Sequence, residues 1–295
     1  MCGICGFSGP GNEHVTERML SVMRYRGPDG IGNWNNGQDV YFGHVRLSIV
    51  DLVTGDQPLV SPDGTLAIVF NGEIYNHQEL RRQLERYGHQ FQTRHSDTEV
   101  LLYGYRQWGL ELTERLNGMW AFALYDKKDN QLWLSRDRFG KKPLFYGQVG
   151  DSFVFSSELH SLATYPGISK EIDEDSLVKY FAHGYVPSPN TLLKNSFKLP
   201  AGHNLVFDLK SRKAKINRYW RYIPEPDNAY LQNPTLAAER LVEEMYSAVK
   251  LRMVADVPVG VFLSGGVDSS SVTSMAVSCQ RGDSVNSFSI GFEEE

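Results

Sequence analysis

Short apolar segments separated by polar turns fill the first 210 residues of the chain. Leu66–Phe70 has the length and composition of a buried strand, and it stops at Asn71-Gly72, a dipeptide typical of tight turns. Buried strands in such runs, with few helices between them, predict a β-sandwich or a layered α+β domain. Further strand candidates are Met119–Tyr125, Leu132–Leu134 and Phe153–Phe155.

Two amphipathic helices have clear starting signals within this region. Asn76 and Ser96 are each followed three residues later by Glu, which is the pattern of a capping box. Apolar residues then recur at helical spacing until Gly88 in the first segment and Gly109 in the second. We therefore expect side-chain caps at Asn76 and Ser96, and helices that end at the two glycines.

The character of the sequence changes after residue 210. Residues 221–235 carry three prolines and little periodicity, and Asn233-Pro234 then offers a helix cap with a first-turn proline. Val257–Leu263, a glycine-rich turn, a helix from Ser270 and a strand over Val285–Ile290 predict one βαβ unit.

The lengths of these regions predict how the chain is divided. We expect a complete domain over 1–210, a connector over 211–232 and an incomplete α/β domain over 233–295. The 63 residues of the last region are too few to cover both faces of a parallel sheet. The sequence therefore looks like a fragment.

Charge and hydropathy argue against several classes of protein. With 30 basic and 35 acidic side chains the formal charge is −5, so we expect no nucleic-acid or anionic membrane partner. The longest apolar run, Met119–Tyr125, has seven residues, whereas a membrane-spanning helix needs about twenty. The N-terminus lacks the pattern of a secretory signal, and three cysteines are too few for a disulfide framework. We expect a cytoplasmic location.

Cys2 is the most informative residue for chemistry. Once Met1 is removed, a nucleophilic thiol and a free α-amine, a suitable proton acceptor near neutral pH, belong to the same residue. The structural alternative is a small apolar residue in a first strand. Cys2 and Cys5 also match a Cys-x-x-Cys pattern, but three cysteines cannot complete a four-cysteine zinc site, and residues three apart in a strand face opposite sides.

Charged and polar residues later in the first region could bind a substrate. Arg46 lies in a strand-like run and needs an anion, either a structural carboxylate or the carboxylate of a ligand. Asn71-Gly72-Glu73 places an amide, a backbone N–H and a carboxylate together, as in an oxyanion hole, although a hairpin turn would use the same dipeptide. Asp97 follows Ser96 in a first helical turn, where the helix dipole alone would favour it.

A glycine-rich loop, Ser264-Gly-Gly-Val-Asp-Ser-Ser270, lies between the predicted strand and helix of the second region. Small residues and the N–H groups of a helix N-terminus suit the binding of phosphate. The loop lacks the Gly-Lys-Ser/Thr of a Walker motif. A tight structural turn is the alternative.

Jointly, several motifs resemble a known family. MCGI, RGPDG, GHVRLSIVD, FNGEIYN, SDTEVLLYGY and RDRFGKKPLFY are similar to the N-terminal-nucleophile glutamine amidotransferases, and most similar to the glutaminase domain of glutamine-dependent asparagine synthetases. SGGVDSS resembles the pyrophosphate loop of ATP pyrophosphatases. The resemblance implies an α+β fold, an αββα-type sandwich, followed by the first βαβ unit of an ATP-pyrophosphatase domain.

The resemblance also implies roles for individual residues. Cys2 would attack the side-chain amide of glutamine, while Asn71 and the N–H of Gly72 hold the developing oxyanion. Arg46 would bind the α-carboxylate of glutamine, Glu73 and Asp97 its α-ammonium, and the backbone at Ile49 and Val50 would lie against it. For ATP the implied residues are Leu263 and Ile290 near the adenine, and Ser264, Gly265, Gly266, Asp268 and Ser269 near the pyrophosphate and Mg2+, with Asp268 at the metal.

The implied reaction converts aspartate, ATP and glutamine to asparagine, AMP, pyrophosphate and glutamate. The small-molecule partners would be glutamine, aspartate and ATP, and the family pattern allows for a homodimer. Two alternatives stay open: a different amide-forming synthetase with another acceptor carboxylate, and a glutaminase or glutamine-sensing fragment that makes no amide. A redox protein using Cys2 and Cys5 is a further alternative.

Overall fold

The computed structural model describes residues 1–280 and 284–291 and divides into two units, Met1–Arg221 and Tyr222–Glu295. The expected boundary at residue 210 is therefore too early. β12 (Lys213–Arg218) pairs along its whole length with β11 (His203–Asp208), so the start of the expected connector belongs to a sheet. The rest of the connector includes a short helix, α7 (Asn228–Gln232).

Two six-stranded sheets form the body of the first unit, and all their neighbouring strands pair antiparallel. In order across the first sheet these are β10 (Ser196–Lys198), β8 (Phe145–Val149), β9 (Ser152–Ser156), β1 (Gly3–Ser8), β3 (Val40–Arg46) and β2 (Gly30–Asn35). The second sheet runs β12, β11, β7 (Gln131–Arg136), β6 (Gly118–Asp126), β5 (Leu66–Ile74) and β4 (Leu59–Val60).

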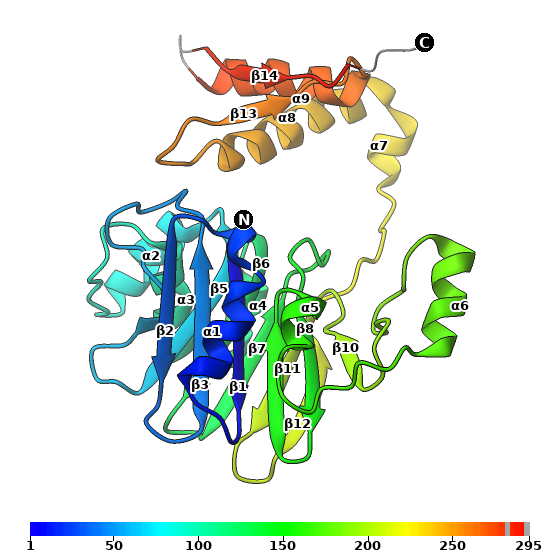
Figure 1. The fold of residues 1–295 in the computed structure, drawn as a ribbon. Helices are drawn as coiled ribbons and strands as arrows, with labels where there is room; N and C mark the ends of the chain where they lie inside the picture. The colour runs from blue at the N-terminus through cyan, green and yellow to red at the C-terminus, as the bar shows by residue number, and fades with distance from the viewer. Residues whose placement is uncertain (281–283, 292–295) are drawn as a thin grey trace. The chain divides into compact units, whose positions relative to one another are not determined.

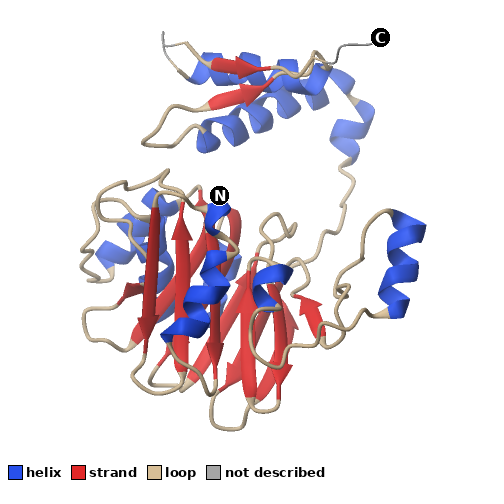
Figure 2. Ribbon diagram, in the orientation of Figure 1, coloured by secondary structure: helices blue, strands red, loops and turns tan. Residues whose placement is uncertain are grey.

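Three apolar layers hold the sheets and helices together, and Figure 2 shows the strands with helices on their outer sides. One cluster lies between the sheets, one covers the second sheet under α2 (His77–Arg86), α3 (Asp97–Trp108) and α4 (Leu112–Arg115), and one covers the first sheet under α1 (Glu13–Ser21) and α5 (Leu159–Leu162). The expected αββα sandwich is confirmed. A further helix, α6 (Glu174–His183), ends at Gly184, whose φ of 75° suits glycine.

The two-residue period of the central strands determines which side chains meet between the sheets. In β1, Ile4 packs in the layer between the sheets, whereas Cys5 packs under α1. In β5, Ala67 and Val69 pack between the sheets, and Ile68 packs under the helices. By the same alternation, residues 2, 71 and 73 face the layer between the sheets.

Two local predictions in this region are wrong. Asn71-Gly72 is not a turn, because β6 pairs with β5 through this dipeptide, with Asn71 opposite Ala121 and Gly72 opposite Trp120. The helices do begin after Asn76 and Ser96, but neither side chain caps its helix. The side-chain oxygen of Asn76 instead accepts a hydrogen bond from the backbone N–H of Asn117 at 2.9 Å.

The strand candidates Leu66–Phe70, Met119–Tyr125, Leu132–Leu134 and Phe153–Phe155 all lie within observed strands, namely β5, β6, β7 and β9. Each observed strand extends beyond the apolar run that predicted it. Pairing with a neighbouring strand continues through polar residues, which explains the extra length.

The second unit is a βαβ unit preceded by two helices (Figure 1). After α7 come α8 (Pro234–Arg252), β13 (Gly260–Phe262), α9 (Val267–Cys279) and β14 (Asn286–Phe288), and the two strands are parallel as expected. Asn233 caps α8 through a bond from the N–H of Leu236, at 3.2 Å. α9 begins at Val267 rather than at the expected Ser270, because the glycine-rich loop itself supplies the first turn.

Across residues 1–280 and 284–291, no helix combines the length and apolar character that a membrane span requires.

Candidate active site

Cys2 lies immediately before β1, at the end of the layer between the sheets. Its sulfur is 3.4 Å from the backbone nitrogen of Leu47 and 3.5 Å from the oxygen of the same residue. The carbonyl of Cys2 accepts a hydrogen bond from Nε of Arg26 at 3.0 Å, and Arg26 in turn pairs with Glu158. These contacts hold Cys2 between Leu47, which follows β3, and the short 3-10 helix Arg24–Arg26, with Cys2 half-buried.

Burial sets the protonation of the thiol and of the neighbouring amine. It raises the pKa of the Cys2 thiol, so the resting side chain is neutral, although the N–H of Leu47 and the nearby amine oppose the rise. Burial also lowers the pKa of the N-terminal ammonium, carried here by Met1, and the cations of Arg26 and Lys142 lower it further. Burial therefore disfavours the charged forms of both groups, and an uncharged α-amine is the form that could accept the proton of a cysteine thiol.

The side chain of Asn71 is buried, and its amide has no protein partner among the described residues. Neither its amide nitrogen nor its amide oxygen has a hydrogen-bond partner within the part of the chain that the structure describes. An unpaired buried amide costs about 1–3 kcal/mol, so such a group calls for an explanation. Since it faces the layer that Cys2 also faces, a ligand oxygen between them would satisfy it.

The free edge of β5 supplies a backbone donor beside Asn71. Even-numbered residues of β5 point their polar backbone groups away from β6: Leu66 exchanges bonds with Ser61, and the N–H of Ile74 donates to Asp97 at 3.0 Å. Gly72 shares this edge and lines the pocket at Cys2. A Cβ at Gly72 would lie 2.1 Å from the carbonyl oxygen of Met119, so only glycine fits.

Glu73, which is half-buried, and Asp97, which is buried, line the same pocket as the thiol. Burial and the charge of Asp97 raise the pKa of Glu73 to about 8, and burial also raises the pKa of Asp97. Asp97 begins α3 and accepts the N–H of Ile74, so the helix start and the end of β5 fix its position. Two carboxyl groups close together disfavour each other's ionised form, and a bound cation would relieve that repulsion.

Arg46 has a protein carboxylate as its partner. Nη1 pairs with Asp56 at 2.6 Å, and Nη2 donates to the carbonyl of Asp51 at 2.6 Å. The Arg46 side chain is 9% exposed and that of Asp56 is 85% exposed, so solvent reaches only one side of the pair. Arg46 therefore ties together the two ends of the loop 51–56. Arg46 also lines the pocket at Cys2.

The structure brings the glutamine-site candidates together in one small pocket. Its lining includes seven of them: Cys2, Arg46, Ile49, Val50, Gly72, Glu73 and Asp97. The eighth, Asn71, is buried in β5 next to Gly72 and is not part of the lining. The sequence reasoning missed Leu47, Gln57 and Thr98 in the lining, and Arg26 and Lys142 in the field of the thiol and amine. Arg26 lies in the RGPDG motif and Lys142 in the RDRFGKKPLFY motif, so these motifs could have pointed to both residues.

The ATP-site candidates lie at one end of the βαβ unit. Gly265 has φ of +83°, which favours glycine, and the hydroxyl groups of Ser264 and Ser269 are 3.1 Å apart. Asp268 lies exposed in the first turn of α9, next to Gly266 at its N-cap. Leu263 and Ile290 follow the two parallel strands, the position where ligands of open α/β sheets bind.

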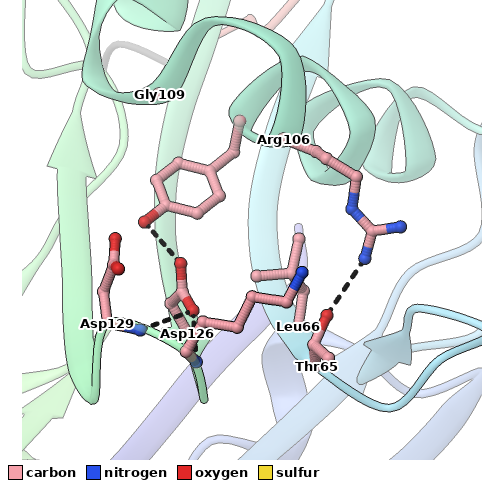
Figure 3. A pocket seen from close by; sticks show the side chains of 8 residues that line it. Thr65, Leu66, Arg106, Gly109, Asp126 and Asp129 are labelled. Carbon is pink, nitrogen blue, oxygen red and sulfur yellow. Dashed lines mark hydrogen bonds between the residues drawn. The ribbon is translucent and has the colours of Figure 1, made fainter.

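A different pocket of the first unit is filled by structural pairs (Figure 3). The hydroxyl of Tyr105 donates to Asp126 at 2.9 Å, and Arg106 bonds to Thr65 at 3.1 Å and to Asp63. The polar groups of Tyr105, Asp126 and Arg106 thus already have protein partners, unlike the amide of Asn71.

Comparison with curated proteins extends over nearly the whole chain. Asparagine synthetases (glutamine-hydrolysing) 3 and 1 of Bacillus subtilis are 37% and 38% identical over 100% and 99% of this chain, and a relative from Methanocaldococcus jannaschii is 40% identical over 99% of it. The chain spans only 48%, 46% and 60% of the lengths of these three relatives.

Solved structures support the fold. The glutamine phosphoribosylpyrophosphate amidotransferase of Bacillus subtilis, complexed with ADP and GMP, has a TM-score of 0.56 at 20% identity, over 97% of this chain and 65% of that one. Similarity at this identity shows the architecture alone.

Family models match both regions of the sequence. Residues 240–295 match the model described as asparagine synthase, and residues 1–220 match the model described as a glutamine amidotransferase domain. The second match covers most of the chain and includes all of the pocket at Cys2. The chain therefore belongs to the glutamine amidotransferase domain family.

Proposed function

We propose that this chain hydrolyses glutamine at Cys2, as the ammonia-generating part of a glutamine-dependent asparagine synthetase. The observation that carries the proposal is the unpartnered amide of Asn71, buried beside a thiol and a glycine N–H at the free edge of β5. The family match and the names of the relatives support the same function.

The reaction begins once Met1 has been removed and the α-amine belongs to Cys2. As the sulfur attacks the side-chain amide of glutamine, the amine accepts the thiol proton. Negative charge then develops on the amide oxygen, where the Asn71 amide and the Gly72 N–H stabilise it. The amine next protonates the leaving nitrogen, ammonia departs, and water hydrolyses the Cys2 thioester to glutamate.

Recognition of glutamine follows from the charges around the pocket. Glu73 and Asp97 would bind the α-ammonium of the substrate, which also relieves the cost of placing two carboxylates together. Arg46 would bind the α-carboxylate, which takes the place of Asp56 on the guanidinium. The backbone at Ile49 and Val50 would complete the wall behind the substrate.

The second unit would bind ATP, and the amide product would be asparagine. ATP would activate the side-chain carboxylate of aspartate as an adenylate, and ammonia would displace AMP. Ser264, Gly265, Gly266 and Ser269 would surround the pyrophosphate, with Leu263 and Ile290 near the adenine. Asp268 is exposed, and one carboxylate with substrate phosphates suffices to hold Mg2+, which would neutralise phosphate charge.

The same site is compatible with a different acceptor carboxylate, because the described residues contain no assigned aspartate pocket. We place the reaction in the cytoplasm, since a free nucleophilic cysteine needs a reducing compartment and all three cysteines are unpaired here. A homodimer remains part of the proposal taken from the family pattern.

The test is the rate of glutamate formation from glutamine by the purified chain, beside Cys2→Ala and Cys2→Ser. Wild-type turnover with loss in both variants at unchanged Tm supports the proposal. Hydrolysis that survives in Cys2→Ala would place the nucleophile elsewhere. Absence of turnover in a wild-type sample that has lost Met1 would rule out the glutaminase.

A further inference from the structure

His44 is a buried side chain that the proposed glutamine hydrolysis does not use. It lies in β3 directly opposite Ile4 of β1 and is 1% exposed. Ile4 and Phe42 both pack in the layer between the sheets, so His44 faces the same layer by strand alternation. A polar ring in an apolar layer is costly unless it is hydrogen-bonded, so its contacts call for an explanation.

The ring of His44 reaches from one sheet to the other. Nε2 lies 3.2 Å from the carbonyl oxygen of Phe70 in β5, a strand of the second sheet. A carbonyl only accepts hydrogen bonds, so Nε2 carries the proton. Nδ1 has no hydrogen-bond partner within the part of the chain that the structure describes. Burial lowers the pKa of His44 to about 3, which keeps the ring neutral.

This hydrogen bond joins the two halves of the proposed site. Cys2 immediately precedes β1 in the first sheet, whereas Asn71 and Gly72 immediately follow Phe70 in the second. Apolar packing between sheets has no preferred direction, but a hydrogen bond fixes both a distance and an angle. The bond from His44 to Phe70 therefore ties the strand of the oxyanion groups to the sheet that carries the thiol.

We propose that His44 is a positioning residue of the glutaminase site, which sets the separation between the Cys2 sulfur and the oxyanion groups of Asn71 and Gly72. The inference rests on the glutaminase function proposed above. Oxyanion donors act only within hydrogen-bond distance of the oxygen where charge develops, and a displacement of ~1 Å can cost about 100-fold in rate. Because His44 acts through Phe70 rather than on the substrate, its effect belongs in kcat rather than in KM.

The first experiment compares His44→Phe with His44→Gln. Phenylalanine keeps a ring but has no donor, whereas the amide nitrogen of glutamine can donate from about the position of Nε2. His44→Phe should lower kcat for glutamine by at least ~10-fold and leave KM within ~2-fold of wild type. His44→Gln should recover part of the lost kcat.

Arg212→Met is the matched control. Arg212 follows β11 of the second sheet, and it donates to Ser8 and pairs with Asp39 of the first unit's other sheet edge. Ser8 is the last residue of β1, at the opposite end of that strand from Cys2. The control therefore removes a polar link between the sheets far along β1 from the site, and kcat should not change.

A second readout separates the thiol from the oxyanion groups. Alkylation of Cys2 by iodoacetamide displaces iodide from a CH2 carbon, so no charge develops on a carbonyl oxygen. Its rate, resolved from Cys5 and Cys279 by peptide mapping, should stay within ~2-fold of wild type in His44→Phe. A wild-type chain that begins at Cys2 and is alkylated but does not hydrolyse glutamine would contradict the proposed function itself, and the role of His44 with it.

Two outcomes in an active wild-type background would overturn the role of His44 alone. One is a folded His44→Phe protein with the wild-type kcat. The other is a His44→Phe protein whose kcat and alkylation rate fall by the same factor, which indicates a loosened site rather than displaced oxyanion groups.

A measurement on the wild-type chain tests the hydrogen bond even if His44→Phe does not fold. NMR of the ring nitrogens, assigned by comparison with His44→Gln, should show a neutral ring with its proton on Nε2 between about pH 5 and 8. A proton on Nδ1, or titration of the ring within this range, would mean that His44 does not hold Phe70 and would overturn the proposal.

Discussion

The side-chain oxygen of Gln57 accepts a hydrogen bond from the N–H of Phe70 at 2.6 Å, one residue before Asn71. The carbonyl of the same Phe70 accepts a bond from Nε2 of His44 at 3.2 Å. The pairing of β4 with β5 reaches only as far as Leu59, opposite Ile68. At Phe70 the side chains of Gln57 and His44 therefore bond to the backbone groups that a longer β4 would have paired. Beyond Phe70 no described strand pairs with this edge of β5, so the N–H of Gly72, the next even-numbered residue, lies at an open edge of the sheet.

Replacement of Gln57 should therefore affect catalysis as well as stability. Gln57→Leu leaves the N–H of Phe70 without an acceptor, which should cost about 1–3 kcal/mol of unfolding free energy. Displacement of the oxyanion donors should lower kcat for glutamine by at least ~10-fold, with a smaller change in KM. Gln57→Glu, which retains an acceptor oxygen, is the matched comparison.

Denaturant unfolding and steady-state kinetics measure the two effects separately. A Gln57→Leu protein that loses stability but keeps the wild-type kcat would show that Phe70 does not position the oxyanion donors.

The sequence predicted where the strands lie better than it predicted how they pair. The four apolar runs of the first unit all fall in strands, because burial between layers leaves a local pattern. Asn71-Gly72 was expected to be a turn, and its pairing with Ala121 and Trp120 overrides that local preference. The extra length of β5 depends on a strand almost fifty residues away, which no local window contains.

The site shows the same division between local and distant information. Motifs predicted Cys2 as the nucleophile and Asn71 and Gly72 as the oxyanion residues, but they did not predict that Asp56 pairs with the guanidinium of Arg46. Ser96 was expected to cap α3, whereas Glu99 accepts the N–H groups of Gln92 and Thr93 instead. Contacts of this kind arise from how loops fold back on the sheets, so side-chain chemistry alone does not specify them.

The Glu73 carboxyl should make stability depend on pH. Its pKa is raised in the folded chain, so the folded state binds a proton between about pH 4.5 and 8 that the unfolded state has released. Stability should therefore fall as pH rises through that window, by at most about 1.4 kcal/mol per unit from this group.

Glu73→Gln removes the titration but keeps the volume. The variant should be more stable than wild type at pH 8 and close to it at pH 4.5, while KM for glutamine rises because a ligand of the α-ammonium is lost. Chemical denaturation at a series of pH values gives the difference. A constant difference across the range would mean that the Glu73 carboxyl has an ordinary pKa.

Substitution of Arg46 and substitution of its partner Asp56 should have different effects on KM for glutamine. Arg46→Lys keeps the charge but loses the bidentate geometry, so KM for glutamine should rise several-fold. Asp56→Asn removes a carboxylate that competes for the guanidinium, so KM should fall or stay unchanged. Stability should change by less than ~1 kcal/mol in Asp56→Asn, because the Asp56 side chain is 85% exposed.

Steady-state kinetics with glutamine, and with an analogue lacking the α-carboxylate, test the assignment of Arg46. The lysine variant should handle the analogue like wild type. If it loses the same factor on both substrates, Arg46 only holds the loop 51–56.

The central claim is that the α-amine and the thiol of one residue form the catalytic pair, and its most direct test is the rate of glutamate formation by two forms of the N-terminus. One form begins at Cys2, and the other carries a single alanine before Cys2, with both termini verified by intact mass. The fold and the thiol are the same in each, but the extended form has its amine one residue away. Loss of the base should lower kcat/KM for glutamine by at least ~100-fold. Equal rates in the two forms would contradict the account.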